Sequence, residues 1–350
     1  MRRLSPRFAL LAPLLLIALA TLIPLGSAPS RVSLWLEWSD LLVNLALFLP
    51  LGLALASQPT PLGRVALLAL AMSTAIELLQ ATLIPGRRGS PVDILANTAG
   101  ALAGALLYRA FLAARRAPGP ASTGYVAAVL LLPVLAWLAC GVLLAPAAPR
   151  QGIWWGQWAH HFEDTEPFRG TIRSVRFLGR PVPDGPVDSM APFLAEAAQG
   201  VFSLEVTLLS GGTTTGPTHL ASVATGTGYA LIGLEQRGDD LLLRWRSRAA
   251  EFGLRRPQMT FPGALRSAQG ESLRVQAIVT PTRAGATVER GGERREAERR
   301  LTLVTGWRTL IPTSALRASV QTLFDVIWTL CLVGHLLFAL RVLRSLRLSY

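Results

Sequence analysis

The sequence predicts an α-helical integral membrane protein of about six transmembrane helices that also carries an all-β jelly-roll sandwich outside the membrane. Two observations lead to this fold class. Of the 350 residues, 51% are hydrophobic, and many of them lie in long runs. Between about residues 150 and 312, these runs give way to short alternating segments separated by turn residues. Long apolar runs are typical of membrane helices, and alternation is typical of half-buried strands.

The apolar runs predict the positions of the spans. A bilayer core of about 30 Å requires roughly 20 apolar residues. The stretches that meet or approach this length are about 8–26, 40–57, 63–84, 91–113, 125–145 and 319–340. The second is short and contains Pro50 and Gly52, which neighbouring helices can accommodate. We interpret the first as an uncleaved helix rather than a signal peptide, because Pro29 would follow the candidate cleavage site.

Arginine is distributed unevenly among the short segments that flank these spans. With the N-terminus in the cytoplasm, the arginines at the cytoplasmic ends are Arg2, Arg3, Arg7, Arg64, Arg109, Arg115, Arg116, Arg341, Arg344 and Arg347. Those at the outer ends are Arg31, Arg87 and Arg88. Excess positive charge marks the cytoplasmic side. We therefore expect a multi-pass protein of the bacterial inner (plasma) membrane, with both termini cytoplasmic and residues 150–312 periplasmic.

Polar side chains occupy matching positions on three of the predicted spans. They are Asp40 and Asn44, Glu77 and Gln80, and Asp93 and Asn97, with Arg87 in the connection between the last two pairs. Each pair is three or four residues apart and therefore shares one helix face. The predicted orientation puts all of them in the outer half of the bilayer. Gly100 and Gly104 follow with a small-xxx-small spacing, which permits close helix approach.

These residues also resemble a known family. The stretches Glu77-Leu-Leu-Gln80, Pro85-Gly86-Arg87 and Asp93-Ile-Leu-Ala-Asn97-Thr-Ala-Gly100, together with the polar run from Asp40 to Gly52, are similar to the VanZ-like family over about residues 8–113. That family is named for a protein associated with resistance to the glycopeptide antibiotic teicoplanin. The resemblance implies a membrane topology and a cell-envelope location, and it raises a link to glycopeptide-type resistance.

Two interpretations of the polar cluster remain open. In one, it is a buried network that holds the helices together, with Arg87 folding back onto Glu77 or Asp93. In the other, it is an outward-facing site for the polar head of an envelope lipid or lipid-linked precursor, and Arg87 pairs with phosphate. No histidine, serine–histidine pair or metal-ligand cluster joins these residues. The sequence therefore favours a non-enzymatic role and predicts no catalytic residue, metal or cofactor.

The segment from 150 to 312 predicts a β-sandwich. Expected strands are 170–178, 202–209, 219–224, 229–236, 241–245, 273–280, 286–289 and 300–304, with the charged run 293–300 as a solvated loop or strand edge. Phe168-Arg-Gly-Thr-Ile-Arg-Ser-Val-Arg-Phe177 resembles a strand of concanavalin A-like lectin/glucanase or laminin-G domains. This resemblance implies a domain that binds a carbohydrate or another ligand.

Aromatic and charged residues of this domain offer weaker functional signals. Trp154, Trp155 and Trp158 suit either stacking on sugar rings or, as we favour, an aromatic belt at the membrane interface. His160 and His161 are adjacent, and without a second ligand cluster they do not predict a metal site. Glu205 and Glu235 would serve a glucanase only if they faced each other across a cleft, which no sequence feature indicates.

The sequence thus predicts a VanZ-like transmembrane module at 1–145, a β-sandwich at 150–312, a final helix at 319–340 and a basic tail at 341–350. The expected function is binding of a lipid- or glycan-linked polar group at the outer face of the membrane. The alternative is an intramembrane enzyme or transporter acting on a lipid-linked glycan precursor. Membrane lipids and envelope glycans are the expected partners. Nucleic acid is not, because the net charge of +13 forms no basic stripe with interleaved aromatics.

Overall fold

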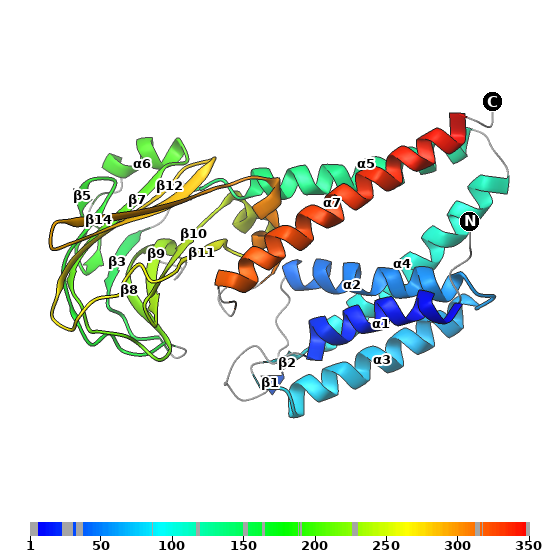
Figure 1. Ribbon diagram of the computed structural model, residues 1–350, viewed down its shortest axis with the longest axis horizontal. Coiled ribbons are helices and arrows are strands. Elements are labelled where there is room, and N and C mark those ends of the chain that lie inside the picture. Colours follow the sequence, from blue (N-terminus) through cyan, green and yellow to red (C-terminus); the bar gives the residue numbers. More distant parts are fainter. Residues whose placement is uncertain are drawn as a thin grey trace. The chain divides into compact units, whose positions relative to one another are not determined.

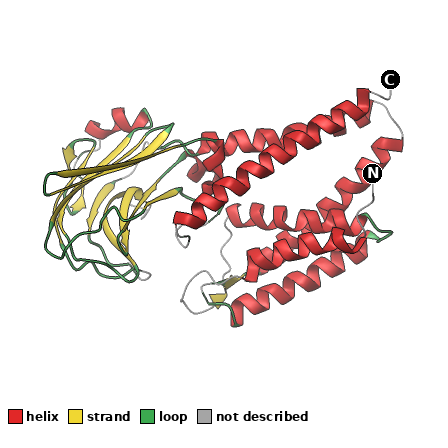
Figure 2. Ribbon diagram, in the orientation of Figure 1, coloured by secondary structure: helices red, strands yellow, loops and turns green. Residues whose placement is uncertain are grey.

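A computed structural model describes residues 6–22, 31–32, 38–85, 87–116, 120–149, 153–162, 165–187, 189, 191–225, 230–311, 316 and 318–347. The chain divides into two compact units. The first comprises Met1–Leu135 and His335–Tyr350, and the second comprises Ala136–Gly334. Helices make up most of the first unit and strands most of the second (Figure 1, Figure 2).

The long helices are α1 Pro6–Leu22, α2 Trp38–Ala56, α3 Leu62–Thr82, α4 Pro91–Arg116, α5 Pro120–Leu143 and α7 Ala318–Arg347. Within the described part of the chain, four segments are long and apolar enough to cross a membrane: Trp38–Ala56, Leu62–Thr82, Pro91–Ala113 and Ala318–Leu337. Leu10–Leu22 and Leu130–Leu143 are shorter apolar helical segments. The helical membrane fold is therefore confirmed, while six spans is an approximate count.

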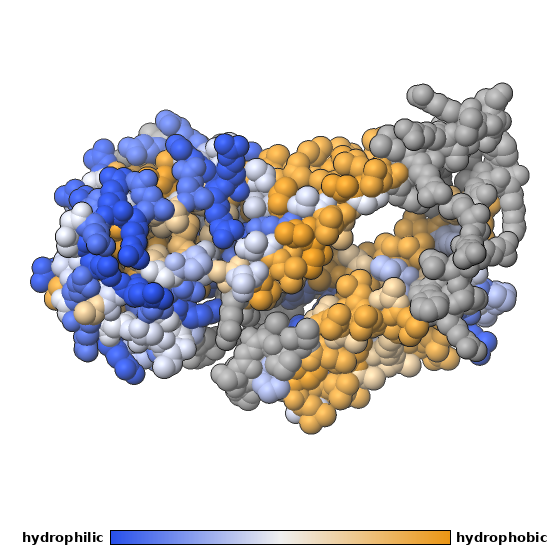
Figure 3. Space-filling model, in the orientation of Figure 1, coloured by the Kyte–Doolittle hydropathy of each residue, from blue (hydrophilic) through white to orange (hydrophobic). Residues whose placement is uncertain are grey.

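The surfaces of these helices are apolar. Leu67, Leu83 and Leu131 are 64%, 70% and 58% exposed, and similar leucines lie along α1 and α7. In the space-filling view, hydrophobic residues cover the visible helices and hydrophilic residues cover much of the sandwich (Figure 3). Contiguous exposed apolar surface on this scale is costly in water, which is consistent with helices surrounded by lipid.

The first four helices form the core of the first unit. Phe48, Leu51, Val65, Ala69 and Ala101 are buried at their centre. Helices α2 and α4 pack most closely, because α4 presents glycine to the backbone of α2. A Cβ atom built on Gly100 would lie 2.2 Å from the carbonyl oxygen of Leu45, and one on Gly104 would lie 2.1 Å from that of Leu49. Such close approach of two backbones is the usual role of small residues in membrane helices.

Two short strands bring the helix connections at one end together. β1 (Arg31–Val32) pairs in parallel with β2 (Arg88–Gly89). β1 lies between α1 and α2, and β2 lies between α3 and α4, so the pairing joins the connections that carry or adjoin the predicted polar cluster. At the opposite ends of the helices, the guanidinium of Arg109 donates a hydrogen bond of 2.9 Å to the carbonyl of Thr60.

The second unit contains two six-stranded antiparallel sheets. The first sheet has the order β11-β10-β9-β8-β3-β6. Its strands are Gln258–Phe261, Asp240–Trp245, Ala230–Arg237, Pro217–Thr225, Trp154–Trp158 and Gly185–Pro186. The second has the order β14-β13-β12-β7-β4-β5. Its strands are Glu293–Arg300, Arg283–Arg290, Ser272–Val279, Phe202–Leu209, Thr171–Phe177 and Arg180–Pro181. The short helix α6 (Ala191–Ala198) lies between β6 and β7 in the chain.

Alternation of side chains explains why these strands form a sandwich. β7 alternates buried and half-buried residues along its whole length, and Phe202, Leu204, Val206 and Leu208 enter the shared core. The expected sandwich is therefore present. One expected strand is wrong: residues 300–304 are not a strand, because Thr302 caps the 3-10 helix Leu303–Thr309. The charged run 293–300 is instead the edge strand β14, paired with β13.

The 3-10 helix Leu303–Thr309, here called the anchor segment, packs between α5 and α7 within the second unit. A Cβ atom on Gly306 would lie 2.8 Å from the Cβ of Cys140 on α5. On the α7 side, the indole of Trp328 donates a hydrogen bond of 2.8 Å to the carbonyl of Leu303. The rings of Trp137 on α5 and Trp328 on α7 are 3.8 Å apart. These contacts fix the sandwich to the ends of both helices.

Candidate functional site

The predicted polar cluster is centred on one face of α3. Ser73, Glu77 and Gln80 follow one another at helical spacing and are all buried, with Glu77 and Gln80 each 6% exposed. The carboxylate of Glu77 accepts a hydrogen bond of 2.8 Å from the backbone N–H of Ser90, the residue before α4. The N-terminus of a helix carries partial positive charge. Glu77 therefore stabilises the start of α4.

Gln80 and Arg87 bind the C-terminal end of α1. The amide of Gln80 donates 2.8 Å to the carbonyl of Thr21, and the guanidinium of Arg87 donates 2.5 Å to the carbonyl of Ala20. Both carbonyls belong to the last turn of α1, where backbone oxygens lack helical partners. Burial lowers the pKa of the Arg87 guanidinium, and the nearby carboxylate of Glu77 opposes this effect.

Asn97 joins α4 to α3. Its amide nitrogen donates a hydrogen bond of 2.8 Å to the hydroxyl of Ser73, and Asn97 is 1% exposed. The amide oxygen of Asn97 and the hydroxyl of Ser90 are also buried, but neither has a hydrogen-bond partner within the described part of the chain. An unsatisfied buried polar atom costs on the order of 1–3 kcal/mol. These two atoms are therefore available to a ligand.

The remaining candidates lie on the edge of this cluster. Asp93 is half-buried in the first turn of α4, where its charge interacts with that of Glu77. Asp40 occupies the first turn of α2 and is half-buried, as is Asn44 one turn later. Described hydrogen bonds thus connect Gln80 and Arg87 to α1, Glu77 to the residue before α4, and Asn97 to Ser73. They do not include Asn44. Gly86 and the side chain of Arg88 lie outside the described residues.

The three tryptophans of the sandwich lie on β3. Trp154 is 0% exposed and packs against Phe177 and Phe193 in the core. This burial excludes Trp154 from both stacking on sugars and an interfacial belt. Trp158 is half-buried against the same core, while Trp155 is 40% exposed. The prediction failed for Trp154 because the alternation of β3 directs consecutive side chains to opposite faces of the sheet.

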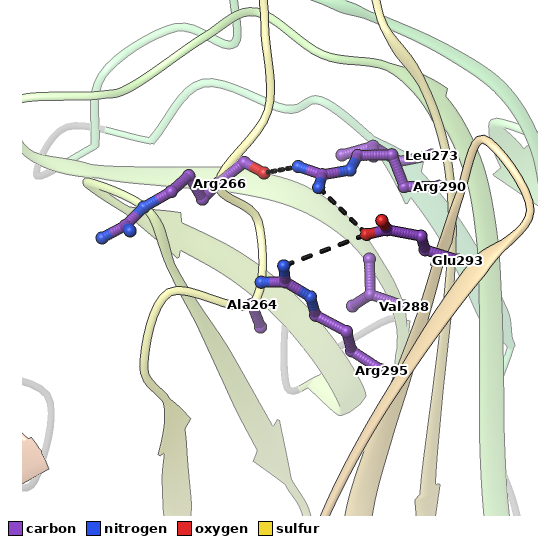
Figure 4. A pocket seen from close by; sticks show the side chains of 7 residues that line it. All are labelled: Ala264, Arg266, Leu273, Val288, Arg290, Glu293 and Arg295. Carbon is purple, nitrogen blue, oxygen red and sulfur yellow. Dashed lines mark hydrogen bonds and ion pairs between the residues drawn. The ribbon is translucent and has the colours of Figure 1, made fainter.

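A pocket opens on the sandwich beside the β13–β14 hairpin (Figure 4). Its lining residues are Ala264, Arg266, Leu273, Val288, Arg290, Glu293 and Arg295. Arg290 donates 2.5 Å to the carbonyl of Arg266 and 3.4 Å to the carboxylate of Glu293. It also lies 3.6 Å from the carboxylate of Glu271. The most enclosed guanidinium is thus already paired, which makes the pocket a poor candidate for binding an anion.

Among the described residues, no group of three or more histidine, cysteine, aspartate or glutamate side chains is arranged to hold a metal ion. His160 lies 3.3 Å from Asp184 at the surface, while Glu163 and Asp164 lie outside the described residues. Glu205 and Glu235 belong to different sheets, where they bind Arg274 and Arg244 respectively. Glu205 and Glu235 therefore do not form the pair of opposed carboxylates that a glucanase requires.

The sequence did not reveal an ion pair of the second unit that includes a fully buried arginine. Arg308 in the anchor segment is 0% exposed and binds the carboxylate of Asp325 on α7 through two hydrogen bonds of 2.6 and 3.3 Å. The indole of Trp307 donates 2.8 Å to the same carboxylate. An acidic residue within an apolar helix was the available signal, since such a residue requires a partner. Asp325 is thus engaged within its own unit.

A family model described as VanZ/LLP1 matches residues 7–112. This range contains α2 and α3, nearly all of α1 and most of α4, and therefore the whole polar cluster. No curated protein and no solved structure matches the chain. The family match ends before the sandwich begins. Residues 7–112 are therefore a VanZ-like domain, and a separate two-sheet β-sandwich follows this domain in the chain.

Proposed function

We propose that the VanZ-like domain binds the polar headgroup of a membrane lipid or of a lipid-linked glycan, at the end where β1 and β2 pair. The observation that carries this proposal is the set of buried polar atoms that the fold leaves unused. The amide oxygen of Asn97 and the hydroxyl of Ser90 are such atoms. The carboxylate of Glu77 accepts a hydrogen bond from the backbone N–H of Ser90, which ties this residue to α3.

The contacts divide the cluster into two roles. Gln80, Arg87 and one oxygen of Glu77 satisfy helix ends, so they position the site. The amide oxygen of Asn97 and the carboxylate of the half-buried Asp93 would accept hydrogen bonds from ligand hydroxyl groups, and the hydroxyl of Ser90 would donate to a phosphate oxygen. Arg87 contributes positive charge beside them, which favours an anionic headgroup. A site that combines buried acceptors and a cation suits a headgroup containing both phosphate and hydroxyl groups.

The location follows from the arginine distribution. We place the β1–β2 end on the periplasmic side of the inner membrane, because arginines are sparse in the connections at this end. Helices α4 and α5 each cross once more, so the chain would emerge on the same side to form the sandwich. Both parts would then act on molecules of the outer leaflet or the envelope. If the protein contributes to glycopeptide-type resistance, as the VanZ-like resemblance suggests, it would do so by binding such a molecule.

One observation favours a second function, an enzyme or transporter acting on a lipid-linked glycan precursor. The carboxylates of Glu77 and Asp93 interact electrostatically beside Arg87. Two coupled carboxylates in an apolar setting can exchange a proton with a ligand, as proton-coupled transport and general acid–base catalysis require.

Conservative variants distinguish these functions. Full-length Glu77→Gln and Asp93→Asn proteins would be placed in nanodiscs of phosphatidylethanolamine, phosphatidylglycerol and polyprenyl phosphate, and the bound lipid would be measured by native mass spectrometry. Asp239→Asn, in the sandwich, is the matched control. We expect selective retention of one lipid by the wild type and the control, and at least a tenfold loss in Asp93→Asn. Conversion or transport that is lost while lipid retention persists would favour the second function. Unchanged retention with reduced thermal stability would show that the cluster is only structural.

A further inference from the structure

One end of the first sheet lies against the end of helix α5. The indole of Trp245, the last residue of β10, donates a hydrogen bond of 2.9 Å to the carbonyl of Leu144, directly after α5. The backbone N–H of Arg248 donates 2.9 Å to the carbonyl of Ala145. Residues 246–256, here called the proximal loop, therefore begin where α5 ends.

The other end of the proximal loop contacts the anchor segment. The backbone N–H of Arg255 donates 2.9 Å to the carbonyl of Thr309, the last residue of that segment. The preceding residue, Arg308, binds Asp325 on α7. All of these residues belong to the second unit. The proximal loop is thus held between the end of α5 and the part of α7 that carries Asp325.

Apolar side chains become exposed on both helices within one turn of these contacts. Val142 on α5, three residues before Ala145, is 59% exposed, and Leu323 and Val326, on either side of Asp325, are exposed as well. Three helical residues span about 4.5 Å. Because α7 is long and apolar enough to cross a membrane, these side chains would face acyl chains in a bilayer. The proximal loop then lies where the acyl chains meet the headgroups.

Large hydrophobic side chains are exposed at this end of the sandwich. Phe252, the last residue of the 3-10 helix Arg248–Phe252, is 63% exposed. Ile153, directly before β3, is 61% exposed. It lies at the same end of the sheet, because Trp154 pairs with Thr225 at the end of β8, and β8 and β10 both run antiparallel to β9. Exposed side chains of this size are unfavourable in water and favourable at a lipid surface.

The proximal loop is also positively charged. Its eleven residues include four arginines and one glutamate. Arg248 is exposed, and Arg255 and Arg256 are half-buried. Arginine can bury its apolar stem while its guanidinium reaches headgroups. Anionic phospholipids attract positive charge that lies close to the membrane surface. Charge complementarity therefore favours a leaflet that contains anionic phospholipid.

We propose that the proximal loop docks the sandwich onto the adjacent leaflet of the membrane, with Phe252 inserted at the headgroup boundary and Arg248 bound to the phosphates of anionic phospholipids. A guanidinium can bind a phosphate through two parallel hydrogen bonds. This surface belongs to a different unit from the lipid site proposed for the VanZ-like domain, and it binds the bilayer rather than one selected headgroup. It attaches the sandwich to the membrane independently of the anchor segment.

A fluorescent label beside Phe252 measures how deeply the loop enters the bilayer. The full-length protein, with Cys140 and Cys331 replaced by serine, would carry Glu251→Cys labelled with the polarity-sensitive fluorophore NBD. Nanodiscs would contain phosphatidylcholine, alone or with a third replaced by phosphatidylglycerol, and a lipid with a quenching nitroxide near the top of its acyl chain. Gln269→Cys, at the opposite end of the sandwich, is the matched label position.

Two variants in the labelled protein test the two contacts separately. Phe252→Ser removes the inserted ring, and Arg248→Gln removes the charge while it keeps a polar side chain. Phe162→Ser and Arg266→Gln are the matched controls, because both residues are exposed and lie away from the proximal loop. Phe162 packs against His219 near the start of β8, and Arg266 pairs with Asp239 before the start of β10.

In phosphatidylglycerol nanodiscs, we expect quenching at Glu251→Cys to be at least three times that at Gln269→Cys. Phe252→Ser is expected to remove at least half of this quenching, and Arg248→Gln to remove the increase that phosphatidylglycerol causes, while both controls leave quenching unchanged. Equal quenching at the two labels, quenching unaffected by Phe252→Ser, or no effect of phosphatidylglycerol would overturn the proposal. A label that is shielded from water but not quenched would also overturn it, because the loop would then contact protein.

The docking surface and the VanZ-like lipid site can fail separately. Asp93→Asn is expected to leave quenching at Glu251→Cys unchanged, and Phe252→Ser is expected to leave selective lipid retention unchanged. A loss of quenching in Asp93→Asn would contradict the assignment of docking to the proximal loop.

Discussion

Individual residues of this protein show how buried charge is compensated. Arg308 has no exposed surface, yet its guanidinium is paired with Asp325, stacked 4.5 Å from the ring of Trp307 and held by the packing of the anchor segment. Removing one partner from such a pair leaves an uncompensated charge, whereas removing both need not destabilise the protein. The Arg308–Asp325 pair therefore makes the attachment of the sandwich sensitive to single substitutions.

Asp325→Asn is expected to lower the free energy of unfolding by on the order of 3–5 kcal/mol, because the charge of Arg308 remains buried without a counter-ion. Thermal unfolding in detergent, followed by tryptophan fluorescence, measures this loss. The double variant Asp325→Leu, Arg308→Met is expected to recover most of it. Glu298→Gln is the control, since Glu298 and Arg283 are an exposed pair, and its effect is expected to stay below about 1 kcal/mol. Equal effects of both single variants would contradict this prediction.

His219 predicts a pH-dependent stability of the sandwich. Burial lowers its pKa from 6.5 to about 4, with smaller contributions from His160 and Arg244, which lower it, and Asp184, which raises it. The unfolded chain then binds a proton between pH 6.5 and 4 that the folded state does not, so stability falls as the pH falls through this window. The full effect is on the order of 3 kcal/mol. Melting curves of wild type and His219→Gln between pH 7 and 4 check this, because the variant is expected to lose this part of the dependence.

Most helices and several strands could be predicted from hydrophobic patterns in the sequence. The apolar runs predicted α2 to α5 and α7 to within several residues, because a bilayer demands long hydrophobic segments. Strands β7, β9 and β10 were also predicted closely, since they alternate or are continuously apolar. For β14, the sequence left open a solvated loop or a strand edge, because seven of its eight residues are charged and hydrophobic alternation is absent. β3 was missed because its tryptophans also suited an interfacial belt.

Packing of α4 on α2 predicts the effect of enlarging its glycines. A Cβ at Gly100 or Gly104 would overlap the carbonyl oxygen of Leu45 or Leu49, so Gly100→Ala and Gly104→Ala are each expected to destabilise the VanZ-like domain by about 1–3 kcal/mol. Gly63→Ala, where nothing lies within 4 Å, is the control. Resistance to unfolding in increasing dodecyl sulfate measures the change. A control that loses as much as Gly100→Ala would argue against close helix packing as the cause.

At the scale of the whole molecule, the sequence predicted the cluster members but not their partners. Glu77, Gln80 and Asn97 could be grouped because helical spacing puts them on shared faces. Their bonds to Ser90, Thr21 and Ser73 depend on how helices cross, which spacing does not determine. Neighbours across the first sheet were equally hidden, because the row Gln157, Ser222, Gly233, Arg244 and Gln258 takes one residue from each of five strands and appears only once register is known.

Topology predicts which parts of the chain face the same compartment. In a background with Cys140 and Cys331 replaced by serine, Leu83→Cys and Gln269→Cys are expected to react with a membrane-impermeant maleimide from the periplasmic side. Ser57→Cys, in the connection between α2 and α3, is expected to react only after the membrane is opened. Labelling of intact spheroplasts, with gel-shift detection, measures all three. Reaction of Leu83→Cys and Ser57→Cys from one side would invalidate the proposed orientation.

The edge strand β14 has a consequence for how copies of this protein behave together. Its residues Glu293–Arg300 are nearly all charged and exposed, and a strand at a sheet edge carries backbone groups without a neighbour on one side. Such an edge would otherwise recruit a strand from another chain. The glutamates and arginines of β14 are strongly hydrated, and a second strand could pair with this edge only by removing that water. The charges of β14 therefore disfavour edge-to-edge pairing of sandwiches from neighbouring copies, even at high density in a membrane.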